Sequence, residues 1–273
     1  MIVDGKTSVV TGGAGGIGKG FAEKLLARGG RVALLDRDPQ RIDAAVEALQ
    51  TGDDPLVGIV ADVTDEASMR SARLAVESRW GSPDLLVNAA GLLIRGVPVV
   101  DFTPEAWRAL FDVNLVGIAN SVRAFLPGML ARGLPGHIVN VASLSGFLVV
   151  NRRIGGYSAA KFAVVGYSEA LAAELEGTQV GLSILAPGLV STDFYVTSAE
   201  RTNGLNLPGR LVETPDDIRS AMKPAEVAEI ALSGVERGQI YIMTHRGLGE
   251  TLADRHTAVM RGLPEYNLPE RSF

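Results

Sequence analysis

Seven short apolar runs, separated by longer segments of helical character, constrain the fold of this 273-residue chain more than any other feature. Several runs are continuously apolar, as strands covered on both faces are. Strands that alternate with helices predict one doubly wound α/β domain, residues 1–273, with a seven-stranded parallel sheet. The predicted strands are residues 7–10, 31–36, 57–61, 84–88, 137–142, 180–186 and 239–243.

A helical pattern over residues 104–132 follows the fourth predicted strand. It begins with Thr103, a good N-cap, and Pro104, a residue favoured at the first helical position. Pro127 lies inside the pattern, and proline in a helix interior removes a backbone hydrogen bond. We therefore expect a kink or break near residues 124–126.

A glycine-rich loop follows the first predicted strand and leads into a helix. Glycines let a backbone approach a pyrophosphate closely, and a helix N-terminus offers free N–H groups and a positive dipole. A glycine-rich loop alone could be a flexible turn, but here strand, loop and helix occur in the required order. The pattern predicts a dinucleotide site within Thr11-Gly12-Gly13-Ala14-Gly15-Gly16-Ile17-Gly18.

Asp36 ends the second predicted strand, where a carboxylate can accept hydrogen bonds from an adenosine ribose. The same carboxylate would repel a 2′-phosphate. Arg37, the next residue, could instead pair with that phosphate. A third interpretation makes Asp36 a solvated turn residue. We expect NAD as the cofactor, ahead of NADP.

Tyr157 and Lys161 stand four residues apart, so on a helix they share one face. A free phenol has a pKa near ~10, too high for a base at neutral pH. A neighbouring ammonium can lower that pKa by roughly 1–3 units, because it favours the phenolate. The pair is therefore a candidate proton-transfer device. The alternative is an amphipathic helix with a tyrosine and a lysine whose charged end reaches water.

Together with further motifs, these residues resemble the short-chain dehydrogenase/reductase family in its single-domain form, which has a Rossmann fold. The resemblance covers residues 6–244, and its motifs occur in the family's order. The matches are the glycine turn at residues 11–18, Asp62 with Val63, Asn88-Ala89-Ala90-Gly91, Asn114, Ser143, Tyr157 with Lys161, and Pro187-Gly188 followed by Thr192.

The resemblance implies roles in hydride transfer for four side chains. Tyr157 would exchange a proton with the substrate oxygen, and Ser143 would hydrogen-bond the same oxygen. Lys161 would lower the tyrosine pKa and hold the nicotinamide ribose, and Asn114 would place a water of the proton relay. Ser143 could instead merely end a strand, with Ser145 as its rival, and Asn114 could bridge within its own helix.

The resemblance also implies a set of cofactor-binding positions. Asp62 would contact the adenine, and backbone near Val190, with Thr192, would fix the nicotinamide carboxamide. Asn88 could also be a simple turn residue. The full set is Gly12, Gly16, Ile17, Gly18, Asp36, Arg37, Asp62, Val63, Asn88, Gly91, Tyr157, Lys161, Pro187, Val190 and Thr192.

Two positions depart from the family pattern. Ala89 stands where a second asparagine is common, which removes a side-chain partner from the central sheet. The gap from Ser143 to Tyr157 is 14, one longer than the common spacing, and we place the extra residue within 149–156. This segment carries Arg152 and Arg153, so the family's pocket rim is not carried over to this chain, whereas its chemistry is.

The irregular segment 188–222 is long for a connection inside a compact domain, and such segments are often active-site lids. Polar groups are few among the residues expected to line the substrate pocket, which favours a bulky hydrophobic or aromatic secondary alcohol or ketone. Arg95 and the two arginines near the rim could pair with an acidic group of the substrate. The expected substrate contacts are Leu144, Phe147, Ile154, Phe194 and Tyr195. The alternatives are an NADPH-preferring ketoreductase of the same fold and a non-catalytic dinucleotide-binding protein.

Charge and composition exclude several other classes. The net charge is −5 without a Lys/Arg-rich run, which argues against a nucleic-acid partner. Cysteine is absent, and the N-terminus lacks the apolar region of a secretory signal. The apolar stretches are interrupted short of a membrane span. We expect a cytoplasmic protein without a membrane partner.

A metal is not expected. Asp62, Asp65 and Glu66 could together hold Mg²⁺, but such a cluster is more often a strand end followed by an acidic first helical turn. A homotetramer is expected, because the helix after Tyr157 carries many small residues and the helix over 104–132 has surplus apolar surface. The residues 249–273 form a C-terminal extension with one short helix over 250–260.

Overall fold

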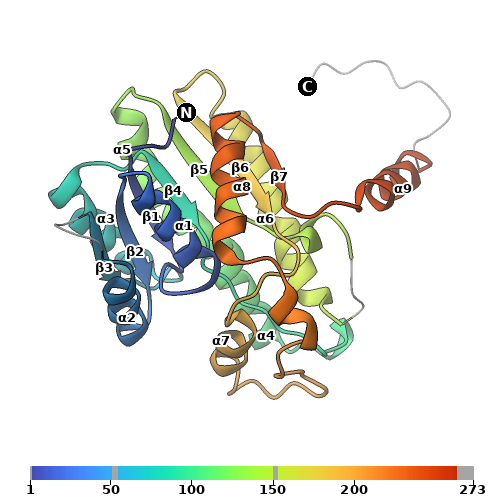
Figure 1. Ribbon diagram of the computed structural model, residues 1–273. Coiled ribbons are helices and arrows are strands. Elements are labelled where there is room, and N and C mark those ends of the chain that lie inside the picture. Colours follow the sequence, from blue (N-terminus) through green and yellow to red (C-terminus); the bar gives the residue numbers. More distant parts are fainter. Residues whose placement is uncertain (1, 51–54, 150–152, 263–273) are drawn as a thin grey trace.

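The computed structural model describes residues 2–50, 55–149 and 153–262 (Figure 1). Seven strands in these ranges pair in parallel as one sheet, in the order β3-β2-β1-β4-β5-β6-β7. Every strand predicted from the sequence is present, with ends shifted by at most two residues, and the doubly wound fold is confirmed. The strands are β1 (Thr7–Thr11), β2 (Arg31–Asp36), β3 (Leu56–Val60), β4 (Leu85–Asn88), β5 (Gly136–Val141), β6 (Val180–Ala186) and β7 (Tyr241–Met243).

Helices cover both faces of the sheet (Figure 1). They are α1 (Gly16–Ala27), α2 (Pro39–Leu49), α3 (Glu66–Trp80), α4 (Pro104–Phe111), α5 (Gly117–Ala131), α6 (Gly155–Glu174), α7 (Phe194–Arg201), α8 (Pro224–Glu236) and α9 (Gly249–Met260). On one face α1, α2 and α8 bury side chains such as Phe21 and Val227. On the other, α3, α5 and α6 bury side chains such as Met69 and Phe125. The strands therefore need apolar residues on both sides.

Because the strands are parallel, their carboxyl ends meet at one edge of the sheet, and the loops that follow them gather there. The loop 12–15 follows β1, Ser143 follows β5 and Pro187 follows β6. The segment 188–222, which contains α7, continues beyond this edge, and in Figure 1 it lies at the same end of the molecule as α4. Residues far apart in the sequence are thus brought to one place.

The helix that contains Pro127 differs from the expectation. α5 continues through Pro127 without a break, because Phe125 and Met129 on either side are fully buried and hold the helix against the sheet. The irregularity lies earlier, at Asp112–Val116, where a turn of π-helix joins α4 to α5. The predicted kink near residues 124–126 is wrong. The π-turn contains Asn114, and such turns occur frequently at functional sites.

The helical run Pro104–Ala131 is, by length and composition alone, apolar enough to cross a membrane. From the sequence, every apolar stretch is expected to be too short to cross a membrane. By this criterion that expectation is wrong. However, 44% of its most apolar window is buried inside the fold, and core helices of soluble proteins pass the same test. Its packing against the sheet explains the apolar composition.

A chain of buried polar side chains connects β4, β5 and α6. Asn88 donates to Oδ1 of Asn140 at 2.8 Å, and Asn140 donates to Oγ of Ser168 at 2.9 Å. Ser168 donates in turn to the carbonyl of Val164 at 2.7 Å. Oδ1 of Asn88 has no protein partner, and Ala89 beside it supplies no donor. Asn88 is therefore an interior residue of the sheet and not a simple turn residue.

His137 is a buried histidine in β5. Its Nε2 lies 2.8 Å from Oγ of Ser183, whose hydroxyl donates to the carbonyl of Gln239 at 2.6 Å. Burial lowers the pKa of His137 from 6.5 to about 4. The folded protein keeps this imidazole neutral, whereas the unfolded chain binds a proton below pH 6.5. We expect the free energy of unfolding to fall between pH 6.5 and 4, by at most about 3 kcal/mol from this group.

Denaturant unfolding at pH 7, 5.5 and 4 measures this loss. His137→Gln should be less stable than wild type at pH 7, but it should lose less stability on acidification, because its side chain does not titrate. His256→Gln, on the exposed surface of α9, serves as the control and should follow wild type. Equal pH dependence for wild type and His137→Gln would contradict the prediction.

Candidate active site

Ser143, Tyr157 and Lys161 come together at the carboxyl edge of the sheet. Ser143 follows β5, and the other two lie one turn apart on α6, which begins at Gly155. Tyr157 and Ser143 share a side-chain hydrogen bond. Nζ of Lys161 lies 5.7 Å from the centre of the Tyr157 ring. The four-residue spacing therefore places both side chains on one helix face, as predicted.

Ser143, and not Ser145, meets Tyr157. The backbone N–H of Ser145 donates to Oγ of Ser143 at 3.1 Å, so Ser145 helps to hold the hydroxyl in place. The same Oγ lies 3.5 Å from the carbonyl oxygen of Pro187. Ser143 thus sits between the turn after β5 and the segment after β6.

Burial is the largest influence on the pKa values of Tyr157 and Lys161. It raises the pKa of Tyr157 above the ordinary value of 10, against the hydrogen bond with Ser143, which lowers it. Burial also lowers the pKa of Lys161 from 10.5 to about 7. Nζ of Lys161 donates to the carbonyl of Val141 at 2.8 Å. The pKa of Tyr157 is thus raised and not lowered as expected, because removal from water disfavours the phenolate more than the hydrogen bond with Ser143 favours it.

Asn114 is fully buried in the π-turn. Its Oδ1 accepts a hydrogen bond from the N–H of Leu92 at 3.2 Å. Its Nδ2 donates to the carbonyls of Leu92 and Leu110 at 2.8 and 2.9 Å. The side chain therefore clamps the segment after β4 to the helix, and Oδ1 accepts a single hydrogen bond from the described residues.

The glycine-rich loop shows the close approaches that a dinucleotide site needs. A Cβ on Gly18 would lie 2.3 Å from the carbonyl oxygen of Gly12, and a Cβ on Gly12 would lie 2.8 Å from the backbone of Ala90. Gly15 precedes α1 without a side-chain cap, so N–H groups of the first helical turn are available to a phosphate. Ile17 packs behind the loop against the sheet core. These residues fit a pyrophosphate.

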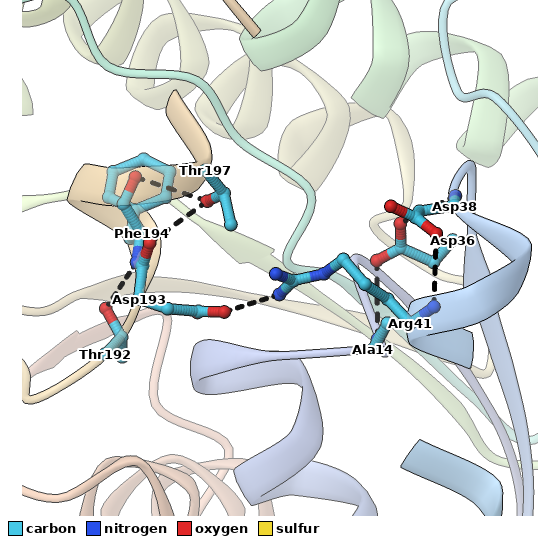
Figure 2. A network of polar contacts seen from close by, with 8 residues as sticks. All are labelled: Ala14, Asp36, Asp38, Arg41, Thr192, Asp193, Phe194 and Thr197. Carbon is cyan, nitrogen blue, oxygen red and sulfur yellow. Dashed lines mark hydrogen bonds and ion pairs between the residues drawn. The ribbon is translucent and has the colours of Figure 1, made fainter. Parts of the chain in front are cut away.

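Two backbone N–H groups hold the carboxylate of Asp36. This carboxylate lies where we expect the adenosine end of a dinucleotide bound at the glycine-rich loop. Its Oδ2 accepts from the N–H of Ala14 and its Oδ1 from the N–H of Asp38, both at 3.3 Å. Figure 2 shows this carboxylate close to Arg41 and the loop residue Ala14. Arg37 is exposed beside it. Asp36 is therefore an anchored group that faces the loop, not a freely solvated turn residue.

Asp62 and Val63 follow β3. Burial would raise the pKa of Asp62, but hydrogen bonds from the N–H and hydroxyl of Thr64, at 2.9 and 2.8 Å, lower it instead. Val63 buries its side chain in the core beside Gly117. Asp65 caps α3 by accepting from the N–H of Ala67 at 2.8 Å. Among the described residues, no group of three or more acidic, histidine or cysteine side chains is placed to hold a metal.

Part of the segment 188–222 lies beside Tyr157 and the glycine-rich loop. The ring centre of Phe194 lies 6.4 Å from that of Tyr157. Oγ of Ser198 accepts from the N–H of Leu93 at 3.1 Å, which fastens α7 to the segment after β4. Thr192 lies against the glycine-rich loop, since a Cβ on Gly16 would meet its methyl group at 3.5 Å. Val190 is buried and pairs with Met222 in an isolated bridge.

The expected substrate contacts divide into two groups. Phe194 and Tyr195 lie near Tyr157. The ring of Phe194 is next to that of Tyr157, and the charge of Tyr195 raises the pKa of Tyr157. Leu144 is buried next to Ser143, and Ile154 immediately precedes α6.

Phe147 lies elsewhere. It packs edge-on against Tyr241 of β7, with ring centres 5.9 Å apart, and joins the core cluster around α6. Arg152 lies outside the described residues. Near Tyr195, the guanidinium of Arg95 lies 4.9 Å from the ring centre and also donates to the carbonyl of Glu213.

Sequence reasoning missed several residues that shape the site. Asn140 and Ser168 extend the polar chain between β5 and α6, and a polar residue flanked by two valines in β5 was a usable signal for Asn140. Ser198 gave no such signal, because its partner Leu93 is 105 positions away.

Comparison with known proteins agrees with this geometry. The family model described as short chain dehydrogenase matches residues 6–203. The 1-deoxy-11-beta-hydroxypentalenate dehydrogenase of Streptomyces avermitilis is 31% identical over 264 residues, which cover 96% of this chain and 93% of that protein. The galactitol 2-dehydrogenase (L-tagatose-forming) of Cereibacter sphaeroides is 36% identical over 236 residues, covering 85% and 87%.

The solved structures include a short chain dehydrogenase/reductase from Burkholderia phymatum in complex with NAD. It matches this chain with a TM-score of 0.85 at 29% identity, over 99% of this chain and 100% of that one. The family and this relative support a nicotinamide dinucleotide as the cofactor. The relatives are named as dehydrogenases of hydroxyl compounds. The chain therefore belongs to the short-chain dehydrogenase/reductase family and is an oxidoreductase that acts on CH–OH groups.

Proposed function

We propose that this enzyme transfers a hydride between NAD and a bulky, hydrophobic or aromatic secondary alcohol or its ketone. The observation that carries the proposal is the hydrogen-bonded pair of Ser143 and Tyr157, with Lys161 one helical turn away. When bound, the nicotinamide accepts or supplies the hydride. In the oxidative direction the carbinol carbon loses a hydride and the hydroxyl loses its proton to Tyr157, which leaves the ketone.

Each residue has a defined task in this scheme. Tyr157 is the general acid/base, and Ser143 hydrogen-bonds the same substrate oxygen and steadies its charge. Lys161 holds the nicotinamide ribose, and when it is protonated its charge favours the phenolate. Asn114 holds the segment after Gly91 and places a relay water on its remaining lone pair.

The cofactor is held along the carboxyl edge of the sheet. The glycine-rich loop takes the pyrophosphate, Asp36 takes the adenosine ribose, and Asp62 and Val63 border the adenine. The nicotinamide end is held by backbone of Pro187 and Val190 and by Thr192, beside Asn88 and Gly91.

The segment 188–222 acts as a lid in this proposal. Phe194 and Tyr195 supply apolar lining next to Tyr157, which supports a bulky apolar substrate. Arg95, stacked on Tyr195, allows an acidic group of the substrate at the pocket rim.

A panel of alcohols and ketones, assayed by nicotinamide absorbance with both cofactors, tests the proposal. Turnover confined to small polyols would contradict the substrate class, and no turnover of any member would favour a non-catalytic dinucleotide-binding protein.

We expect Asp36→Ala to relax the preference for NAD(H). The carboxylate repels a 2′-phosphate, so its removal should improve NADPH binding relative to NADH by roughly 10-fold, about 1.4 kcal/mol. Fluorescence titration with both cofactors gives the ratio of dissociation constants. Asp43→Ala, on α2, is the matched control and should leave the ratio unchanged.

The opposite result would change the cofactor assignment. If wild type already binds NADPH more tightly than NADH, then Arg37 is the dominant group, and the enzyme is an NADPH-preferring ketoreductase of the same fold.

The expected assembly and location are part of the proposal. We propose a cytoplasmic homotetramer built on α5 and α6, whose small and apolar surface residues allow close contact between subunits. Light scattering at micromolar concentration measures the mass directly, and a monomer would contradict the tetramer.

A further inference from the structure

An ion pair spans the glycine-rich loop. Arg41 lies in the first turn of α2, and Asp193 immediately precedes α7. Nη2 of Arg41 and Oδ2 of Asp193 are 2.6 Å apart, although the two residues are separated by 152 positions in the chain. Figure 2 shows the guanidinium reaching from the side of Asp36 to Asp193. The pair thus joins the β2–α2 side of the dinucleotide site to the lid.

The pair lies directly over the loop. A Cβ on Gly15 would stand 2.5 Å from Nη2 of Arg41 and 3.3 Å from Oδ1 of Asp193. The φ of Gly15 is −162°, an extended conformation open to any residue. A Cβ at position 15 would therefore displace the guanidinium of Arg41, whereas the backbone conformation of Gly15 is open to any residue.

Both partners are held in place by further contacts. Asp38 accepts from the N–H groups of Gln40 and Arg41 at 3.0 and 3.1 Å, which fixes the turn that carries the guanidinium. Burial would lower the pKa of Arg41, but the hydrogen bond and charge of Asp193, with Asp36 and Asp38 nearby, raise it, so the group stays charged.

On the lid side, the carbonyl of Asp193 accepts from the N–H and the hydroxyl of Thr197, at 3.0 and 3.2 Å. Thr192 accepts from the N–H of Phe194 at 3.3 Å. The position of Asp193 therefore sets the position of the next residue, Phe194, whose ring faces Tyr157. Figure 2 shows these contacts as one connected turn.

We propose that Arg41 and Asp193 form a latch that holds the lid across the pyrophosphate segment of the dinucleotide site and sets how long the cofactor stays bound. This inference rests on the dinucleotide site and the lid proposed above. Release of a bound dinucleotide requires the lid to lift from the loop, and the ion pair opposes that motion. The pair also neutralises Asp193, whose free carboxylate beside Gly15 would repel a phosphate.

A rival role for Arg41 makes the opposite prediction for its partner. If the guanidinium were simply a phosphate ligand, Asp193 would compete for it. Asp193→Asn would then free the guanidinium and slow cofactor release. In the latch, loss of either partner speeds release, so the sign of the Asp193→Asn effect separates the two roles.

The dissociation rate of NADH, measured by stopped-flow fluorescence, tests the latch without reference to turnover. We expect Arg41→Gln and Asp193→Asn each to speed release about 3- to 10-fold at low salt, and less at high salt, because the pair is partly exposed. The exchanged double variant Arg41→Asp/Asp193→Arg should return to within about 2-fold of wild type, since it restores the pair. Arg70→Gln, which removes an exposed ion pair on α3, is the control and should match wild type.

Three outcomes would overturn the latch. They are slower release from Asp193→Asn, a double variant as fast as the single variants, and release unchanged in all variants. These differ from failure of the proposed function, in which wild type shows no NADH signal at all; that result would remove the dinucleotide site and the latch with it.

Discussion

Tyr157→Phe should lower turnover by roughly 10²–10⁴, the usual contribution of a positioned acid/base. The substitution keeps the ring that packs 6.4 Å from Phe194 but deletes the hydroxyl that is bonded to Ser143. The substrate oxygen then loses the phenol as its proton donor and acceptor. Folding and NADH binding should stay close to wild type, because the hydroxyl supports neither the sheet nor the glycine-rich loop.

Steady-state turnover, NADH titration and thermal unfolding of the same preparations test this prediction. Tyr167→Phe is a matched control, since Tyr167 lies on the same helix and packs against the core away from Ser143. It should retain turnover within about 2-fold of wild type. A Tyr157→Phe enzyme with near wild-type turnover would end the assignment of Tyr157 as the acid/base.

Lys161→Met should abolish most activity without loss of stability. The lysine is buried, and its Nζ donates only to the carbonyl of Val141 among the described residues. Turnover should fall by roughly 10² or more, and NADH should bind about 10-fold more weakly, because both the charge and the ribose contact are lost.

The stability of this variant follows from the pKa of the lysine. A folded pKa of about 7 against 10.5 when unfolded means that burial of the charged amine opposes folding. The penalty grows as pH falls from 10.5 to 7 and is fully present below pH 7, on the order of 5 kcal/mol. Methionine removes it, so the unfolding free energy at pH 7 should equal or exceed that of wild type.

Denaturant unfolding and NADH titration measure the two effects separately. Lys24→Met, which makes the same substitution on α1 beside Glu229, should change neither activity nor NADH affinity. A Lys161→Met variant that is both inactive and strongly destabilised would mean that the lysine acts as a structural support.

The sequence by itself determined the architecture and the places of the candidate site residues within it. Alternation of apolar runs with helical segments is a local property, and because parallel strands must be covered on both faces, that pattern admits few folds. The order Gly18, Asp36, Ser143, Tyr157 then placed each functional group at a strand end or first helical turn. The spacing of Tyr157 and Lys161 fixed their shared face, since helical geometry depends on separation alone.

Only the tertiary structure decided the electrostatics and the long-range contacts. The pKa values of Tyr157 and Lys161 depend on how much protein surrounds them, and local spacing carries no information about burial. Pro127 stays within a helix because Phe125 and Met129 are packed against a sheet formed by distant residues. The pairing of Arg41 with Asp193 likewise arises when the fold brings α2 and the segment before α7 together across the loop. Such contacts join segments far apart in sequence, so no local pattern could specify them.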